Sequence, residues 1–136
     1  MSYELREHTA DIAVEAVAET LGGVFAAVAD GMAAAMCDDW PGAGDRSDIS
    51  VTAEGREALL FDYLDELIYE RDVRDVLPVD NDGTVERNGE QWQFAGSYRG
   101  VPLSVITARD LKAVTYSEMD VRRTDDGWSA YVVFDV

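Results

Sequence analysis

Residues 84–98 read TVERNGEQWQFAGSY, and this stretch decides the class of fold. Thr84–Glu86 and Gln91–Tyr98 have the residue pattern of β-strands, and Asn88-Gly89 between them is a dipeptide typical of a tight hairpin turn. The stretch therefore predicts two antiparallel strands that are neighbours in a sheet.

Further strand patterns lie on both sides of this hairpin. Val76–Val79 precedes it, and Val101–Ala108 and Ala113–Arg123 follow it. Asp125-Asp126-Gly127 is a second turn sequence, which leads into the alternating pattern of Trp128–Asp135. The second half of the chain is therefore expected to consist mainly of strands.

Two helices are expected in the first half. From Leu21 to Met36 and from Arg56 to Asp72, apolar residues recur at intervals of three and four, as on one face of a helix. Shorter strand patterns accompany them at Tyr3–Arg6, Ile12–Val17 and Ile49–Ala53. Two helices among runs of strands, without strict alternation, indicate an α+β fold with mainly antiparallel sheet and two helices packed on it.

The length and composition favour one intracellular domain. A chain of 136 residues is expected to form a single unit, 1–136. No apolar run approaches the roughly 20 residues of a membrane span, and the N-terminus lacks the pattern of a secretory signal, so we expect a cytoplasmic protein without a membrane partner. Cys37 is the only cysteine, and its alanine-rich surroundings predict a buried, unreactive thiol.

The charge is strongly negative. The chain has 28 Asp and Glu against 11 Lys and Arg, for a net charge of -17. Self-repulsion of this size is tolerable in concentrated salt, where the screening length falls to about 3 Å at 1 M, so we expect a halophilic protein. Direct binding to RNA or DNA is not expected, because it depends on Lys and Arg contacts to phosphates.

The candidate site is a group of carboxylates from the two ends of the chain. Asp11 begins one strand pattern and Asp135 ends another, so pairing of these strands would bring both carboxylates close to the terminal carboxylate of Val136. Three like charges this close require a proton or a cation among them, and oxygen donors favour Ca²⁺, Mg²⁺ or Mn²⁺. In the alternative, both aspartates simply end strands in solvent.

Two other residues are singled out. His8 is the only histidine, and it is either a hydrogen-bonded structural residue or part of a functional pocket beside Asp11. Lys112 is the only lysine in a chain that otherwise uses Arg for its cations. Either this position needs an ammonium group in particular, or the lysine is a surface residue without a specific role. No phosphate-binding glycine loop, nucleophile elbow or helical zinc motif occurs.

Five motifs in order along the chain resemble the archease family. They are Glu7-His8-Thr9-Ala10-Asp11-Ile12, Thr20-Leu21, Leu64-Asp65-Glu66-Leu67-Ile68-Tyr69, Leu111-Lys112-Ala113-Val114-Thr115-Tyr116 and Phe134-Asp135-Val136. The resemblance spans essentially the whole chain. Ala13 and Ser117 depart from it, because the family commonly has Gly and His there.

The resemblance implies a function for these residues. Archeases are known as activators of the tRNA-splicing RNA ligase, which joins a 3′-phosphate or 2′,3′-cyclic phosphate to a 5′-hydroxyl after guanylylation on its own histidine with GTP and Mn²⁺. It implies that Asp11 and Asp135 bind a divalent metal, with Val136 beside them, and that Lys112 and His8 serve ligase activation. Ca²⁺ is the ion expected in a crystal, with Mg²⁺ or Mn²⁺ as alternatives.

Two other functions are compatible with the same residues. A metal-dependent phosphohydrolase would need a general base near the metal, for which His8 and Glu118 are the candidates. A chaperone-like modulator of a tRNA-modifying enzyme would instead present exposed apolar patches.

Overall fold

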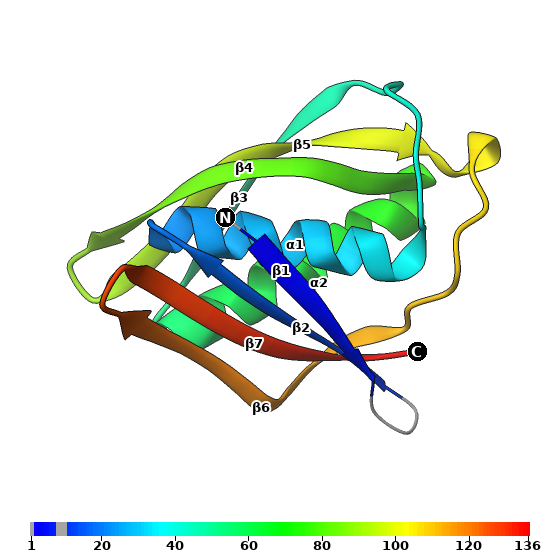
Figure 1. The fold of residues 1–136 in the computed structure, drawn as a ribbon. Coiled ribbons are helices and arrows are strands. Elements are labelled where there is room, and N and C mark those ends of the chain that lie inside the picture. Colours follow the sequence, from blue (N-terminus) through cyan, green and yellow to red (C-terminus); the bar gives the residue numbers. More distant parts are fainter. Residues whose placement is uncertain (1, 8–10) are drawn as a thin grey trace.

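The structure, a computed structural model, describes residues 2–7 and 11–136, and it consists of two antiparallel sheets and two long helices (Figure 1). Along the chain the elements are β1 (Ser2–Glu7), β2 (Asp11–Ala18), α1 (Leu21–Met36), β3 (Arg46–Ala53), α2 (Arg56–Arg74), β4 (Val76–Asn88), β5 (Gln91–Pro102), a 3-10 helix (Leu103–Val105), β6 (Ala113–Thr124) and β7 (Gly127–Asp135). The α+β class predicted from the sequence is confirmed.

The two sheets pair strands from distant parts of the sequence. One sheet has the order β1-β2-β7-β6, and the other has the order β3-β5-β4. The β4–β5 hairpin turns at Asn88-Gly89 as predicted, with Asn88 opposite Gln91 and Gly89 at φ 66°. In the four-stranded sheet the N-terminal hairpin lies against the last strand of the chain, which brings the two ends together.

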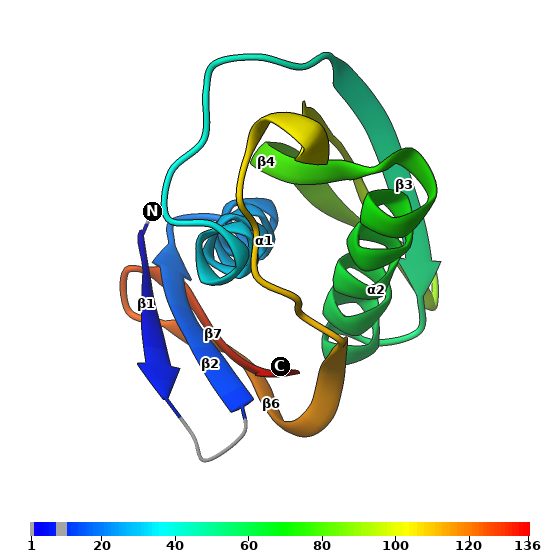
Figure 2. The ribbon, with the colours of Figure 1, turned by 90° about the vertical axis from the view of Figure 1, so that its right-hand side faces the viewer.

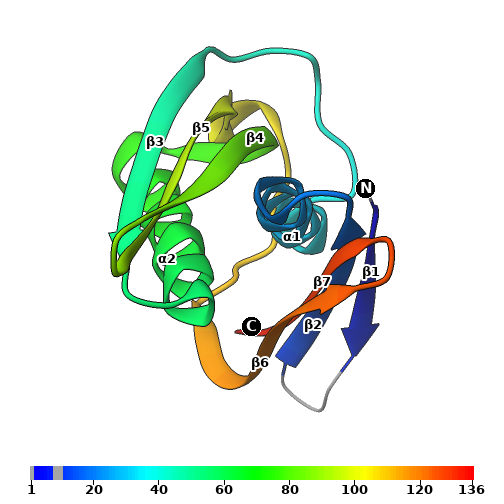
Figure 3. The same cartoon turned by 90° about the vertical axis from the view of Figure 1, so that its left-hand side faces the viewer.

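Helix α1 lies between the two sheets (Figures 2 and 3). The Thr20 hydroxyl caps it by accepting from the N–H of Gly23 at 3.0 Å. Its glycines allow close approach of the sheets: a Cβ on Gly22 would lie 2.7 Å from the Cα of Thr84, and one on Gly31 would lie 2.6 Å from Val14. The helix is therefore buried on nearly every side.

Helix α2 covers the three-stranded sheet and also contacts β6. Its inner face contributes Leu60, Tyr63, Leu64 and Leu67, all fully buried, to one continuous core. It ends at Asp75, which has a left-handed backbone at φ 55°. None of the helices in the described part of the chain is both long and apolar enough to cross a membrane.

Several boundaries differ from the predicted ones. The strand predicted at residues 101–108 is wrong, because β5 ends at Pro102 and Leu103–Val105 form a 3-10 turn whose first N–H bonds the Asp75 carbonyl at 2.9 Å. The patterns at residues 76–79 and 84–86 belong to one strand, β4, with an irregularity between Val79 and Asp82. Cys37 is buried as predicted.

Candidate functional site

The two sequence-predicted aspartates meet at one end of the four-stranded sheet. Asp11 is the first residue of β2 and Asp135 is the last of β7, and the two are directly opposite in the antiparallel register. Directly opposite residues point to the same face, with Cβ atoms about 4.5–5.5 Å apart. The juxtaposition expected from the chain ends is therefore present.

This pair lies near the surface of the molecule. Asp11 is half-buried and Asp135 is exposed, and Val136, which follows it, is 41% exposed. The inward neighbours on the same sheet face, Ala13 and Val133, are buried and apolar. The two carboxylates thus stand at an accessible sheet end, with apolar packing behind them.

Lys112 is tied to the same position by the main chain. Its N–H donates to the Asp135 carbonyl oxygen at 2.8 Å, and Ala113, the first residue of β6, lies opposite Asp135. The Lys112 side chain is exposed. The structure therefore brings Asp11, Asp135 and Lys112 to one place, while His8 lies outside the described residues.

An arginine that the sequence did not single out holds the segment before Lys112. Arg71 of α2 donates from Nη1 to the Leu111 carbonyl oxygen at 2.7 Å, and its side chain is only 11% exposed. Leu111 itself is fully buried. The backbone entering Lys112 is therefore fixed on one side by α2 and on the other by β7.

The donor set suits a hard cation. Two carboxylates on one sheet face repel each other unless a cation or proton lies between them, and oxygen donors prefer Ca²⁺, Mg²⁺ or Mn²⁺. Among the residues that the structure describes, no three or more His, Cys, Asp or Glu side chains form a metal-binding group. The third ligand expected from the sequence is the carboxylate of Val136, which is not a side chain.

Glu118, the other candidate base, lies away from this pair. The β6–β7 register is interrupted between Thr115 and Asp120, and Glu118 in this interruption is exposed with φ 63°. It lies five positions beyond Ala113, which corresponds to roughly 16 Å in a fully extended strand. The structure does not bring Glu118 to the aspartate pair.

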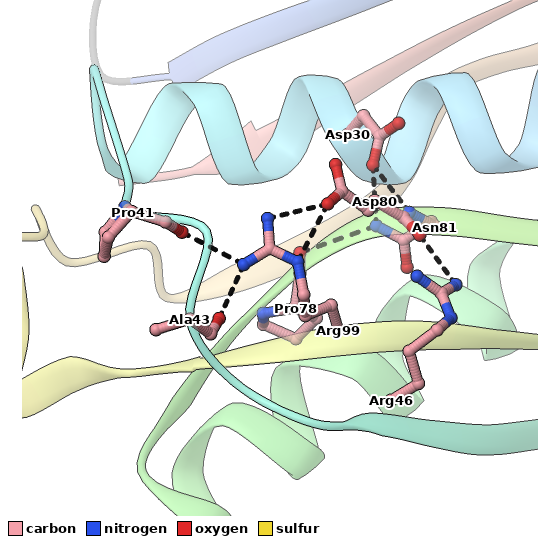
Figure 4. A network of polar contacts seen from close by, with 8 residues as sticks. All are labelled: Asp30, Pro41, Ala43, Arg46, Pro78, Asp80, Asn81 and Arg99. Atoms are coloured by element: carbon pink, nitrogen blue, oxygen red, sulfur yellow. Dashed lines mark hydrogen bonds and ion pairs between the residues drawn. The ribbon is translucent and has the colours of Figure 1, made fainter.

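A second polar cluster joins α1 to β4 and is internally satisfied (Figure 4). One carboxylate oxygen of Asp30 accepts from the backbone N–H of Asn81 at 3.0 Å and from its side-chain amide at 2.9 Å. The Tyr63 hydroxyl donates to the amide oxygen of Asn81 at 3.2 Å. Burial raises the pKa of Asp30 above its ordinary value and raises that of Tyr63 well above its own.

Two arginines complete this cluster at the irregularity of β4. Arg99 binds the Asp80 carboxylate at 2.7 Å, and Arg46 donates to the Asp80 carbonyl oxygen at 2.8 Å. Asp80 has a left-handed backbone at φ 49°. These contacts account for an irregular backbone inside a long strand, so we assign the cluster a structural role.

The chain is similar to archeases over its whole length. A sequence profile of the Archease protein family matches residues 3–136. Protein archease of Methanosarcina barkeri is 34% identical over 142 residues, covering 98% of this chain and 95% of the relative. Protein archease of Archaeoglobus fulgidus is 32% identical, covering 100% of both chains. These names denote a protein family and no reaction.

Solved structures share the fold. The solution structure of Methanobacterium thermoautotrophicum protein 1598 superposes with a TM-score of 0.84 at 26% identity, covering 98% of both chains. A crystal structure titled an archease, possible chaperone, from Thermotoga maritima superposes with a TM-score of 0.64 at 22% identity, covering 96% of this chain and 94% of that chain.

Proposed function

This chain belongs to the archease family, and from that premise we propose that it is a metal-binding activator of the tRNA-splicing RNA ligase. The observation that carries the proposal is the direct pairing of Asp11 with Asp135, with Lys112 bonded to the same residue. These residues match the motifs by which the sequence resembles the family. The partner of this protein is then an enzyme, and the protein itself performs no reaction.

The arrangement suits work on phosphate groups. Asp11, Asp135 and the carboxylate expected at Val136 would hold the divalent ion, which supplies concentrated positive charge to phosphate oxygens. The exposed Lys112 ammonium is a mobile point charge within reach of the same ligand. The backbone of Lys112 is held by the hydrogen bond to Asp135. Only its side chain therefore needs to become ordered when a ligand binds.

The exposure of the aspartate pair suits a site that acts inside the active centre of another protein. The aspartates lie at a sheet end, where Asp11 is half-buried and Asp135 is exposed. A site of this kind excludes water only when a partner covers it, and water exclusion strengthens its electrostatic interactions. We therefore propose that the site is completed by the nucleotide pocket of the ligase, where it promotes guanylylation and multiple turnover.

The test is RNA ligation by limiting cognate ligase in molar KCl, with and without this protein. Wild type is expected to convert single turnover into multiple turnover and to raise the yield of the guanylylated ligase. Asp135→Asn and Lys112→Ala are expected to lose this effect while they keep the circular-dichroism spectrum of the fold. Full activation by Asp135→Asn would refute the proposal.

The matched control is Asp48→Asn. It makes the same chemical change at an exposed carboxylate of β3, which belongs to the other sheet. Because this residue is on a different sheet from the aspartate pair, it is expected to activate as wild type does. Hydrolysis of nucleotides or cyclic phosphates by the protein without ligase would favour the phosphohydrolase function instead.

A further inference from the structure

Two arginines that form no ion pair with a carboxylate of the described residues meet at one tryptophan ring. Five arginines of the described residues make ion pairs with carboxylates, namely Arg71, Arg74, Arg99, Arg109 and Arg122. Within the same part of the chain Arg46, Arg56, Arg87 and Arg123 make none, and of these Arg56 and Arg123 both place their guanidinium groups against the ring of Trp128. In a chain of net charge -17, the meeting of two such guanidinium groups on one ring needs an explanation.

The Trp128 ring joins two separate elements. Arg123 is directly opposite Trp128 in the β6–β7 hairpin, and its guanidinium carbon is 5.5 Å from the ring centroid. Arg56 is the first residue of α2, and its guanidinium carbon is 5.1 Å from the same centroid. Stacking on an aromatic ring restrains each guanidinium and leaves its edge N–H groups available to an anion.

An apolar pocket adjoins the same ring. It has a volume of about 410 Å³ and is lined by Val17, Ala18, Glu19, Thr124, Asp126 and Trp128. Val17 is 47% exposed, which is high for a valine in a sheet. A pocket of this size accepts one or two side chains of another protein, and Trp and Arg are the residues most enriched where interfaces bind tightly.

We propose that the Trp128 surface, comprising Arg56, Arg123, Trp128 and the adjoining pocket, docks an acidic segment of the ligase that inserts an apolar side chain. Carboxylates of the segment would meet the two guanidinium groups, and the apolar side chain would fill the pocket beside Trp128. An RNA strand fits less well, because RNA binding takes its affinity from many Lys and Arg contacts along the phosphates, and only two guanidinium groups meet at this ring. This inference rests on the proposed function, since it names a second contact with the same partner.

The Trp128 surface and the aspartate pair lie at opposite ends of β7. Trp128 is the second residue of this strand and Asp135 is the last, which places them about 23 Å apart along the strand. Figure 1 shows the β6–β7 turn at the left and the C-terminus at the right, and Figure 3 faces the end with the turn. The docking contact therefore sets affinity for the ligase, and the aspartate end sets the activation step.

The experiment measures binding and activation separately. The dissociation constant for the cognate ligase is obtained by fluorescence anisotropy of the labelled protein, and maximal turnover is measured at saturating protein. The variant Arg56→Ala/Arg123→Ala is expected to raise the dissociation constant about tenfold with unchanged maximal turnover. Arg87→Ala is the matched control, because Arg87 lies over Trp92 as a cross-strand pair in the other hairpin. It is expected to bind within about twofold of wild type.

The outcomes separate this inference from the proposed function. Ligase binding that the double variant weakens, in the absence of any activation by wild type, supports the docking surface and refutes the activator function. If the double variant activates the ligase and binds it with wild-type affinity, the docking surface alone is overturned. An equal loss of ligase affinity in Arg87→Ala has the same meaning. Binding of a single-stranded RNA oligonucleotide that the double variant loses, with ligase binding intact, would assign the surface to RNA and overturn the inference. Absence of ligase binding by wild type overturns both.

Discussion

Asp11 and Asp135 stand directly opposite each other across β2 and β7, although they lie near the two ends of the sequence. The pairing depends on the order β1-β2-β7-β6, which inserts the last strand between the N-terminal hairpin and β6. Two like charges fixed on one sheet face repel each other, and a cation bound between them would remove that repulsion. We therefore expect metal binding at this pair to raise the stability of the protein.

The first prediction concerns this linkage. Ca²⁺ or Mn²⁺ is expected to raise the unfolding midpoint of wild type. At 100 times its dissociation constant, the ion is expected to add about 2.7 kcal/mol to the free energy of unfolding. Asp135→Asn is expected to bind the ion at least about tenfold more weakly, because it loses one charged ligand. Isothermal titration calorimetry and thermal unfolding with and without EDTA measure both effects.

The effect of Asp135→Asn on stability is expected to have the opposite sign in the absence of metal. Asp135→Asn removes the repulsion, so in EDTA it is expected to be at least as stable as wild type, whereas with saturating metal wild type is the more stable. Asp48→Asn, at an exposed carboxylate of β3, is the control and is expected to show the wild-type response. An equal metal-induced rise in Asp135→Asn would contradict a site at this pair.

The second prediction concerns Arg71. Arg71→Ala removes the hydrogen bond to the Leu111 carbonyl and leaves that oxygen in a buried environment, so it is expected to cost about 1–3 kcal/mol in the free energy of unfolding. Because the segment entering Lys112 loses its anchor, ligase activation is expected to fall as well. Urea unfolding and turnover assays at saturating protein measure the two effects.

Arg74→Ala is the control for this change. Arg74 pairs with Glu70 one turn apart on the same helix and donates to the Ser47 hydroxyl at 3.2 Å, and the Arg74 side chain is 53% exposed. Helix pairs of this kind contribute about 0.3–0.5 kcal/mol, so this variant is expected to lose less stability than Arg71→Ala and to activate as wild type does. Equal losses in the two variants would argue against a special role for Arg71.

The sequence predicted the parts of the fold that local chemistry determines. Asn88-Gly89 fixes the β4–β5 turn because a glycine tolerates the positive φ found there. Asp11 and Asp135 were predictable as a pair because each lies at the end of a strand pattern, and the register places them opposite each other.

The parts that the sequence did not predict depend on contacts between distant segments. Residues 101–108 have the apolar spacing of a strand, yet Leu103 turns away because its N–H bonds the Asp75 carbonyl at the end of α2. Arg71 occurs in an ordinary charged helix pattern, and nothing local indicates that it reaches Leu111. Both features arise where α2 meets the loop before β6, a junction that no local pattern encodes.

The third prediction concerns the contact of α1 with β4. Gly22→Ala improves helix propensity by about 1 kcal/mol, but the added Cβ would lie 2.7 Å from the Cα of Thr84 and 3.0 Å from the carbonyl carbon of Gly83. Backbone atoms of a paired strand cannot move aside cheaply, so the net change is expected to be a destabilisation of about 1–3 kcal/mol. Urea unfolding measures it. Gly42→Ala meets nothing within 4 Å and is expected to be neutral, so equal effects would contradict the packing argument.

The last prediction concerns the pH dependence that Asp30 imposes. Burial is the largest influence on this carboxyl and raises its pKa above the ordinary value of 3.8, whereas the bonds from Asn81 lower the pKa by a smaller amount. Between 3.8 and the raised value, the native state binds more protons at this site than the unfolded state does. The contribution of Asp30 to stability is therefore full below the ordinary pKa and is lost as pH rises through the raised value.

Asp30→Asn isolates this contribution. The amide oxygen that replaces the carboxylate oxygen can accept the same two bonds from Asn81, which are 3.0 and 2.9 Å long, but it carries no charge. The free energy of unfolding of the variant relative to wild type is expected to rise with pH across that window and then level off. Urea unfolding in molar KCl from pH 3.5 to neutrality measures the difference. Asp62→Asn, on the exposed face of α2, controls for the loss of one negative charge. If the difference in stability between Asp30→Asn and wild type did not vary with pH, burial would not govern the pKa of the Asp30 carboxyl.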